Sequence, residues 1–231
     1  MDFPELHGWQ VSGTEAVALQ KCLADRVRLE NCLPHLPETV AGVDVSYQRH
    51  GEFFFAAVEV LSFPGLTLVE AVTVVNRVSF PYVPGLLSFR ELPVLLDAFR
   101  RLRTIPDVVL VDGQGIAHPR RLGLASHLGL WLDLPTIGCA KSRLCGEHDS
   151  PGQAKGDRVP LRLDGSVVGT VLTTRDRVKP LYVSPGHKID VSTAADFVLR
   201  CAVRYRMPEP TRLAHHLANQ CRLEARVKGE G

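Results

Sequence analysis

The stretch Pro106-Asp-Val-Val-Leu-Val-Asp-Gly-Gln-Gly115 joins a short apolar run to a carboxylate and two glycines. Val108–Val111 is rich in β-branched residues and is bounded by turn residues, which predicts a strand buried on both faces with Asp112 at its carboxyl end. In open α/β sheets, ligands bind in the crevice beyond the strand ends, and glycines let a ligand approach the backbone closely. The alternative is that Asp112 only caps the following turn.

Size and composition favour one globular α/β domain over residues 1–231. The chain is long enough to bury a sizeable core, and its 45% hydrophobic and 23% charged residues are ordinary for a globular protein. A net charge of +2 does not by itself indicate a polyanionic partner, and the six cysteines lack metal-ligand spacing. No apolar run approaches the roughly 18 residues that span a bilayer, and the N-terminus lacks a signal-peptide pattern. We therefore expect a cytoplasmic monomer without a membrane partner.

Before this stretch, the pattern predicts a helix over about 14–31 and then a catalytic core over about 38–222. Thr39–Tyr47, Glu52–Leu61 and Leu66–Val78 fit the strands of an antiparallel meander, with a turn at 49–51. In the first of these strands Asp44 lies between two valines. A carboxylate in the middle of an apolar strand is unfavourable unless it is paired or bound to a metal.

A loop with two prolines, Phe80–Gly85, follows the meander and leads into a helix that is entered near Glu91 and has its body at Val94–Leu102. An aromatic residue on such a stiff loop can insert between stacked bases, as apolar side chains of architectural proteins do. The alternative is that Tyr82 folds onto the core.

After Asp112, a helix near Leu122–Leu130 and a strand at Thr136–Ala140 complete a βαβ unit, which implies parallel pairing. Lys141 follows that strand, where it is either near the site or a solvated loop lysine. The remaining predicted elements are a hairpin (Pro160–Leu163 and Val167–Thr173), a strand (Leu181–Ser184) ended by Pro185–His187, a helix capped by Ser192 through Tyr205, and a last helix capped by Thr211.

Asp44, Glu91 and Asp112 belong to three separate elements in an order that is typical of a ribonuclease H-like fold. We therefore expect an α/β protein with a mixed sheet, three antiparallel strands followed by parallel strands, flanked by helices. Converging acids repel one another unless a divalent cation neutralises them, and oxygen ligands favour Mg²⁺ or Mn²⁺. Such a site activates water for in-line attack on a phosphodiester, with one or two metal ions.

Six segments carry a family resemblance: Val40–Asp44, Phe80–Glu91, Val111–Arg120, Gly138–Leu144, Val183–His187 and Pro208–His215. On them the chain closely resembles endonuclease V, the deoxyinosine 3′ endonuclease of the ribonuclease H-like superfamily. The resemblance implies a DNA repair enzyme that recognises hypoxanthine in DNA, or inosine in RNA. It also implies hydrolysis of the second phosphodiester bond 3′ to the lesion, which leaves 3′-hydroxyl and 5′-phosphate ends.

The resemblance also implies roles for individual residues. Asp44 and Asp112 match the metal ligands, Glu91 matches a third acid that binds the metal or activates water, and His215 could assist the nucleophile or leaving group. His216 has no such counterpart and is expected to be structural. The DNA-contacting set is Pro81, Tyr82 as the wedge, Val83, Pro84, His118 and Lys141. The base pocket is expected near Gly85, Leu87, Gly113, Gly115 and Gly123.

Two other functions remain open at this point. One is a different ribonuclease H-like nuclease that acts on DNA branches or on RNA–DNA hybrids. The other is a metal-free nucleic-acid-binding module in which the acids have no catalytic use.

Overall fold

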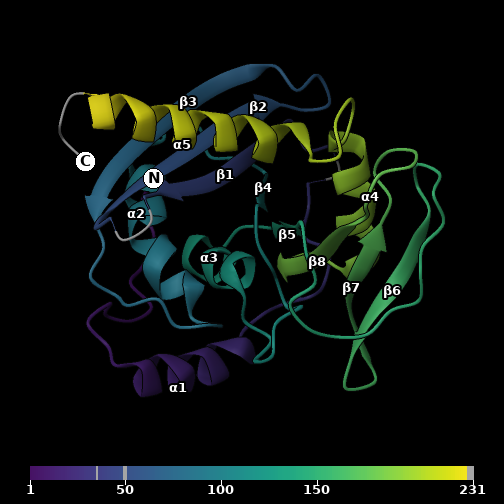
Figure 1. The fold of residues 1–231 in the computed structure, drawn as a ribbon, viewed down its shortest axis with the longest axis horizontal. Coiled ribbons are helices and arrows are strands. Elements are labelled where there is room, and N and C mark those ends of the chain that lie inside the picture. Colours follow the sequence, from purple (N-terminus) through teal and green to yellow (C-terminus); the bar gives the residue numbers. More distant parts are fainter. Residues whose placement is uncertain (35, 49–50, 228–231) are drawn as a thin grey trace.

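The computed structural model describes residues 1–34, 36–48 and 51–227, so most of the predicted turn at 49–51 lies outside the described residues. Within these ranges the chain forms one eight-stranded mixed sheet in the order β3-β2-β1-β4-β5-β8-β7-β6 (Figure 1). The strands are β1 (Thr39–Tyr47), β2 (Phe53–Ser62), β3 (Leu68–Arg77), β4 (Val108–Val111), β5 (Thr136–Ala140), β6 (Arg158–Leu163), β7 (Ser166–Leu172) and β8 (Leu181–His187). The helices are α1 (Gly13–Ala24), α2 (Leu87–Arg101), α3 (Leu124–Leu132), α4 (Val191–Cys201) and α5 (Glu209–Val227).

The pairing of the strands follows the expected order at the start of the chain and departs from it at the end. Strands β1, β2 and β3 form the predicted antiparallel meander, and β4 pairs in parallel with both β1 and β5. The predicted hairpin is confirmed, because β6 pairs antiparallel with β7. The unexpected pairs are β8 with β5 and β7 with β8, which are antiparallel where parallel strands were expected. The parallel part of the sheet is therefore confined to β1, β4 and β5, which is the part that carries Asp44 and precedes Asp112.

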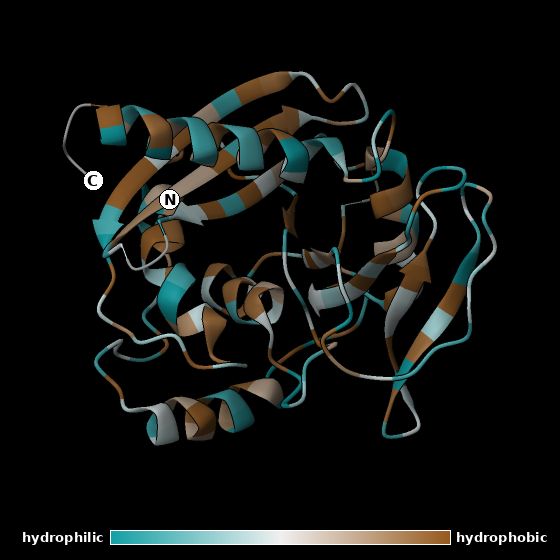
Figure 2. Ribbon diagram, viewed as in Figure 1, coloured by the Kyte–Doolittle hydropathy of each residue, from teal (hydrophilic) through white to brown (hydrophobic). Residues whose placement is uncertain are grey.

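Helices cover both faces of the sheet. Along β1, Ala41 and Val43 pack in a core cluster with α2 and α3, whereas Val40 belongs to a second cluster with α4. This alternation is the pleat of a strand that is buried on both faces. Figure 2 shows hydrophobic residues concentrated in the central strands, while α5 mixes hydrophilic and hydrophobic residues along its length. Helix α5 lies across β1 and β2 (Figure 1).

The N-terminal helix is shorter than predicted. Its start is confirmed, because Ser12 and Glu15 form a capping box. The helix ends at Ala24, although the apolar period continues to Val27. The backbone carbonyl of Arg28 accepts a hydrogen bond from the Lys188 amide, and the Cys32 amide donates to the Lys188 carbonyl. These tertiary hydrogen bonds replace those that a longer helix would make.

Four other predicted boundaries were wrong. Helix α4 is capped by Asp190, whose carboxylate accepts from the Thr193 amide, and ends at Cys201 rather than at Tyr205. Helix α5 begins at Glu209, so Thr211 lies inside its first turn and donates its hydroxyl to the Pro208 carbonyl. Pro210, the second residue of α5, is tolerated in this first turn, because the backbone amide that proline lacks would have no helical partner there. Strand β8 continues to His187 because its last residues still pair with β5.

Among the described residues, no helix is long and apolar enough to cross a membrane.

Candidate active site

Asp44 and Asp112 lie side by side because of the register between β1 and β4. The parallel pairs run from Val40 opposite Val108 to Val43 opposite Val111, and the next pair in this register is Asp44 with Asp112. Both aspartates are four residues beyond Val40 and Val108, so both lie on the same face of the sheet as these valines. That face is the one covered by α4 and α5.

A glycine lets α5 lie directly on this face. If Gly42 carried a Cβ atom, that atom would lie 2.0 Å from the carbonyl group of Pro210, in the first turn of α5. Gly42 is two residues before Asp44 and therefore on the same face of β1. The close approach of the helix to the strand brings His215 to Asp44, where the His215 Nδ1 and Asp44 Oδ2 atoms are 2.7 Å apart.

Three side chains meet at this point. Potential ligand atoms of Asp44, Asp112 and His215 all lie within 4.8 Å of one another. The structure thus brings Asp44, Asp112 and His215 together. Glu91, one turn inside α2, lies outside that triplet but is near enough for its charge to interact with those of the two aspartates.

Burial and mutual repulsion make the carboxylates of this site unfavourable as free anions. Burial, and secondly the charge of Asp112, raise the pKa of Asp44, against the hydrogen bond from His215. Burial, followed by the charges of Asp44 and Asp112, raises the pKa of Glu91 to about 8. A bound cation would relieve both effects, and the oxygen-rich donor set fits a hard divalent ion.

Lys141 supplies a positive charge next to these acids. Its Nζ forms an ion pair with Asp112 Oδ2. Lys141 follows β5 directly, so it reaches Asp112 across the carboxyl ends of two paired parallel strands. The sequence had placed Lys141 on the nucleic-acid backbone, and the structure gives it a partner within the site.

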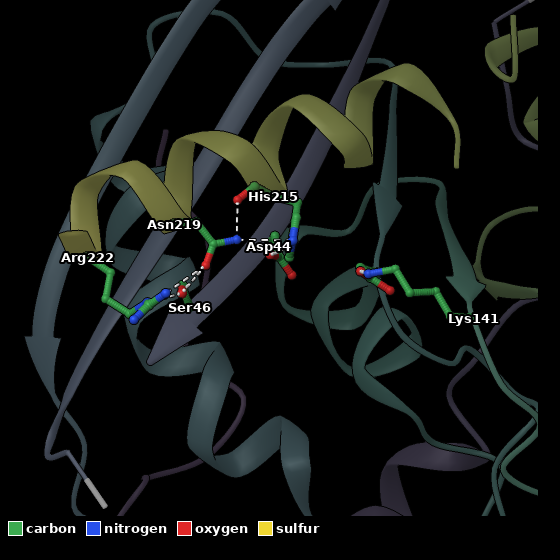
Figure 3. A network of polar contacts seen from close by, with 7 residues as sticks. Asp44, Ser46, Lys141, His215, Asn219 and Arg222 are labelled. Carbon is green, nitrogen blue, oxygen red and sulfur yellow. Dashed lines mark hydrogen bonds and ion pairs between the residues drawn. The ribbon is translucent and has the colours of Figure 1, made fainter. Parts of the chain in front are cut away.

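A chain of hydrogen bonds extends from Asp44 along α5 (Figure 3). The Asn219 amide nitrogen lies 3.0 Å from His215 Nε2, and the Asn219 amide oxygen accepts from the Ser46 hydroxyl over 2.8 Å. Arg222 in turn donates from Nε to the Ser46 hydroxyl over 2.8 Å. None of Ser46, Asn219 and Arg222 was singled out from the sequence.

Two sequence spacings could have revealed this chain. Asn219 is four residues after His215, which places both on one face of a helix, and Ser46 is two residues after Asp44, on the same face of a strand. What the sequence does not contain is the contact between α5 and β1 that joins the two faces.

The loop Phe80–Gly85, which carries the predicted wedge residue Tyr82, lies beside a cavity of about 160 Å³. Tyr82 is 67% exposed, whereas Phe80 at the start of the loop is buried and packs against Phe89. Pro81 is exposed as well. The cavity is lined by Gln20, Tyr82, Val83, Pro84, Gly85, Leu87, Ser88, Gln114, His118, Leu122, Gly123, Leu124 and Leu144.

Of the glycines expected at the base pocket, Gly85 and Gly123 line this cavity but Gly113 and Gly115 do not. A Cβ on Gly115 would lie 2.1 Å from the Pro185 carbonyl oxygen, so this glycine allows the chain after β4 to pack against β8. Leu87 lines the cavity as expected. Gln20 on α1, which the sequence had treated as part of a packing helix, also lines it and donates to the Gly85 carbonyl over 2.9 Å.

His118 belongs to the wall of the cavity rather than to an exposed surface. It is 3% exposed, and its Nε2 lies 3.1 Å from the Gly85 carbonyl oxygen. Burial, and secondly the charge of Arg120, lower the pKa of His118 to about 4. His118 is therefore a neutral side chain that supports the loop carrying Gly85.

Known proteins share this architecture. The family model described as endonuclease V matches residues 21–216. The endonuclease V of Nostoc punctiforme is 50% identical over 219 residues, which cover 95% of this chain and 99% of that protein. The crystal structure of endonuclease V from Bacillus subtilis matches with a TM-score of 0.93 at 31% identity, covering 99% of this chain and 100% of that one.

A third match is a crystal structure with nucleic acid. Endonuclease V from Ciona intestinalis, in complex with a 24mer DNA containing an inosine followed by a ribo-adenosine, matches with a TM-score of 0.81 at 28% identity, covering 91% of this chain and 98% of that one. The family model spans most of the chain, and the Nostoc relative is half identical over nearly its whole length. The chain therefore belongs to the endonuclease V family.

Proposed function

We propose that this endonuclease V is a metal-dependent hydrolase of the deoxyribonuclease V type that recognises hypoxanthine in DNA. In this proposal it hydrolyses the second phosphodiester bond 3′ to the lesion and leaves 3′-hydroxyl and 5′-phosphate ends. The observation that carries the proposal is the meeting of Asp44, Asp112 and His215 within 4.8 Å, in a chain of this family. The inosine-containing DNA bound by the Ciona relative supports the choice of substrate.

Asp44 and Asp112 are the proposed metal ligands, with Glu91 as a third acid that holds or orients water. Their carboxylates are the oxygen donors that Mg²⁺ prefers, and Mn²⁺ can take the same place. When bound, the ion would lower the pKa of the attacking water and offset the charge that develops on the phosphodiester. In this proposal Lys141, whose ion pair with Asp112 brings it next to the acids, contacts a phosphate of the substrate.

The cavity next to Tyr82 is the proposed pocket for a flipped base. It lies between the loop at Gly85 and the start of α3 at Gly123, so backbone groups can approach the edge of the base. A tight, backbone-lined pocket excludes guanine, whose exocyclic amine hypoxanthine lacks. Tyr82, with Pro81, Val83 and Pro84 around it, would enter the gap that the base leaves in the duplex.

An incision assay tests this function. The purified chain is given Mg²⁺ and matched duplexes that differ only in one inosine, and the cleavage position is mapped on a sequencing gel. We expect cleavage at the second phosphodiester 3′ to inosine and no cleavage of the undamaged duplex. Equal cleavage of both would identify a different ribonuclease H-like nuclease, because it would exclude the specialised pocket.

RNA is the second substrate to compare. A matched single-stranded RNA with one inosine separates a DNA repair role from cleavage of edited RNA.

We place the protein in the cytoplasm and expect it to be a monomer. Size-exclusion chromatography with light scattering checks the oligomeric state.

A further inference from the structure

Asn219 occupies a position in which its amide can be oriented in only one way. One of its neighbours is the backbone carbonyl of His215, which only accepts hydrogen bonds and lies 2.9 Å from the amide nitrogen. Another is the guanidinium of Arg222, which only donates and lies 3.3 Å from the amide oxygen. Rotating the amide by half a turn would set acceptor against acceptor and donor against donor. The nitrogen of Asn219 therefore faces His215.

This orientation fixes the proton on the imidazole ring. The amide nitrogen of Asn219 also lies 3.0 Å from His215 Nε2, and an amide nitrogen can only donate. In the neutral ring Nε2 must then be the acceptor, so the proton sits on Nδ1. The Nδ1–H group donates to Asp44 Oδ2 over 2.7 Å.

Ser46 and Arg222 complete the arrangement. Arg222 Nε donates to the Ser46 hydroxyl oxygen, so the hydroxyl proton is directed to the Asn219 amide oxygen. In the chain of hydrogen bonds from Arg222 to Asp44, each group thus donates to the next one toward Asp44. The chain begins at the Arg222 guanidinium, which cannot accept a hydrogen bond. Figure 3 shows the chain running along one side of α5 toward Asp44.

We propose that Asn219, held by Ser46 and Arg222, is a positioning residue that fixes the tautomer of His215. The consequence is that His215 donates a hydrogen bond to Asp44 and has no lone pair on Nδ1 to offer a metal ion. Of the three groups that meet here, only the two aspartates are then metal ligands. The inference rests on the proposed function for its catalytic meaning, but the tautomer itself is a property of the metal-free protein.

The tautomer can be measured directly. Long-range ¹H–¹⁵N NMR spectra of the full chain, metal-free and at a pH where the imidazole is neutral, distinguish a protonated from an unprotonated ring nitrogen. The His215 signals are assigned by their loss in His215→Gln. We expect a protonated Nδ1 and an unprotonated Nε2 in the wild-type protein. A wild-type ring protonated on Nε2 would overturn the proposal.

Asn219→Asp is the decisive variant, because it keeps the shape of the side chain and removes its donor. The new carboxylate can only accept, so we expect Nε2 to carry a proton in this variant. Gln220→Glu is the matched control: it makes the same chemical change one residue along α5, on an exposed side chain, and should leave the His215 signals unchanged. Wild-type signals in Asn219→Asp would contradict the proposal.

Kinetics on an inosine-containing duplex give the second measurement. Partners that orient metal-ligating histidines are worth about 10- to 100-fold in activity, and we take the same range for Asn219, which orients a histidine beside the metal ligands. We expect that loss in kcat for Asn219→Asp with an unchanged KM, because Asn219 does not line the cavity proposed for the base. An unchanged kcat, or a loss confined to KM, would contradict a positioning role.

Two further outcomes are separable. If Asn219→Asp does not fold, as judged by circular dichroism, Asn219→Ala replaces it, because alanine favours the helix and also removes the donor. We then expect His215 to lose its single-tautomer signals, and their persistence would overturn the proposal. If the wild-type protein does not cleave inosine-containing nucleic acid, the proposed function fails, while the NMR result still decides the tautomer.

Discussion

Asp112 lies at the carboxyl end of β4, and its neighbours explain why an aspartate is needed there. On one side the strand register brings Asp44 next to it, and on the other Lys141 forms an ion pair with it. In the proposed site the two aspartates would hold the metal ion, and Lys141 would contact a substrate phosphate beside them. Replacing Asp112 with a neutral residue should therefore impair the chemistry more than the binding of nucleic acid.

We expect Asp112→Asn to lower kcat on an inosine-containing duplex by about 10³-fold, since a lost metal contact removes several kcal/mol of transition-state stabilisation. Binding of the lesion, measured by fluorescence anisotropy, should be kept. Isothermal titration should show weaker Mg²⁺ binding in the variant. Asp196→Asn, which changes an exposed partner of Arg158 on α4, is the control and should behave as wild type. Equal Mg²⁺ binding by wild type and Asp112→Asn would argue against this metal site.

Tyr82 is exposed on a loop that buried Phe80 anchors to the core. If Tyr82 opens the duplex, its removal should matter only where there is a duplex to open. We expect Tyr82→Ala to weaken binding to duplex inosine about 10-fold, because an inserted side chain offsets part of the cost of unstacking a base step, which is on the order of a few kcal/mol. Binding to single-stranded inosine should change little, and Tyr82→Phe should retain duplex affinity. Equal losses on both substrates would show that the ring stacks on a base without separating strands.

Glu91 makes the stability of the metal-free protein depend on pH. Its pKa is about 8 in the folded state against an ordinary 4.5, so the folded protein keeps a proton that the unfolded chain releases. The resulting stability is complete below pH 4.5 and is lost as the pH rises toward 8. Without metal, the free energy of unfolding should fall by about 1 kcal/mol per pH unit in this window.

Urea unfolding at several pH values checks this dependence, with Glu91→Gln as the test variant. Because glutamine does not titrate, we expect the slope between pH 4.5 and 8 to become smaller in Glu91→Gln. Glu224→Gln, an exposed change on α5, should keep the wild-type slope. Mg²⁺ should flatten the wild-type profile by balancing the ionised acids. The same slope in Glu91→Gln and wild type would assign the pH dependence to other groups.

At the residue scale the sequence predicted the acidic residues of the site but not the residues that hold His215 by hydrogen bonds. Asp44 stood out because an ion among valines is unfavourable in a strand, and Asp112 because it ends an apolar run. Ser46 and Asn219 lie at spacings that put them on the same faces as Asp44 and His215, but serine on a strand and asparagine on a helix are too ordinary to stand out. Their importance depends on the contact of β1 with α5, which joins residues 173 positions apart.

At the element scale, the position of α5 on β1 decides the site. Gly42→Ala would place a methyl group 2.0 Å from the Pro210 carbonyl, so the helix would have to move away from the strand. Overpacking of this kind costs about 1–3 kcal/mol. We expect a lower midpoint of urea unfolding and a loss of kcat, because His215 moves with α5.

Gly13→Ala is the matched control for this change. A Cβ at Gly13 meets its nearest neighbour, Leu86 Cδ1, at 4.0 Å, so alanine fits and favours helix α1. Stability equal to or above wild type is expected for this control. If Gly42→Ala were as stable and as active as wild type, the close seating of α5 would not be what places His215.

Elements were predicted well where local patterns determine them. The apolar strands β1, β4 and β5 have the predicted bounds, because their residues are β-branched or apolar and turn residues flank them. Helix ends were wrong where another part of the chain supplies hydrogen bonds. Lys188 stops α1 at a distance of more than 150 residues. The cap of α4 was wrong for a local reason, because Asp190 and Ser192 are both cap-forming residues two positions apart and Asp190 makes the cap. The antiparallel pairing of β8 with β5 also depends on contacts that no local pattern reports.

At the scale of the whole molecule, two core clusters share the same strands. Val40 belongs to one cluster and Ala41 to the other, so the cores lie back to back across β1 and neither can be lost without disrupting that strand. The sheet also runs without interruption from β3 to β6 within the described part of the chain. We therefore propose that residues 1–231 form one folding unit.

This proposal predicts a single cooperative unfolding transition. Trp9 and Trp131 stack with ring centroids 5.2 Å apart on the side of the sheet covered by α2 and α3, so tryptophan fluorescence reports that core. Far-ultraviolet circular dichroism reports all helices and strands, including α4 and the β6–β7 hairpin on the far side. The two signals should change at the same urea concentration, with or without Mg²⁺. A circular dichroism transition that precedes the fluorescence change would instead show that β6, β7 and α4 unfold on their own, as a second unit attached to the sheet that carries the site.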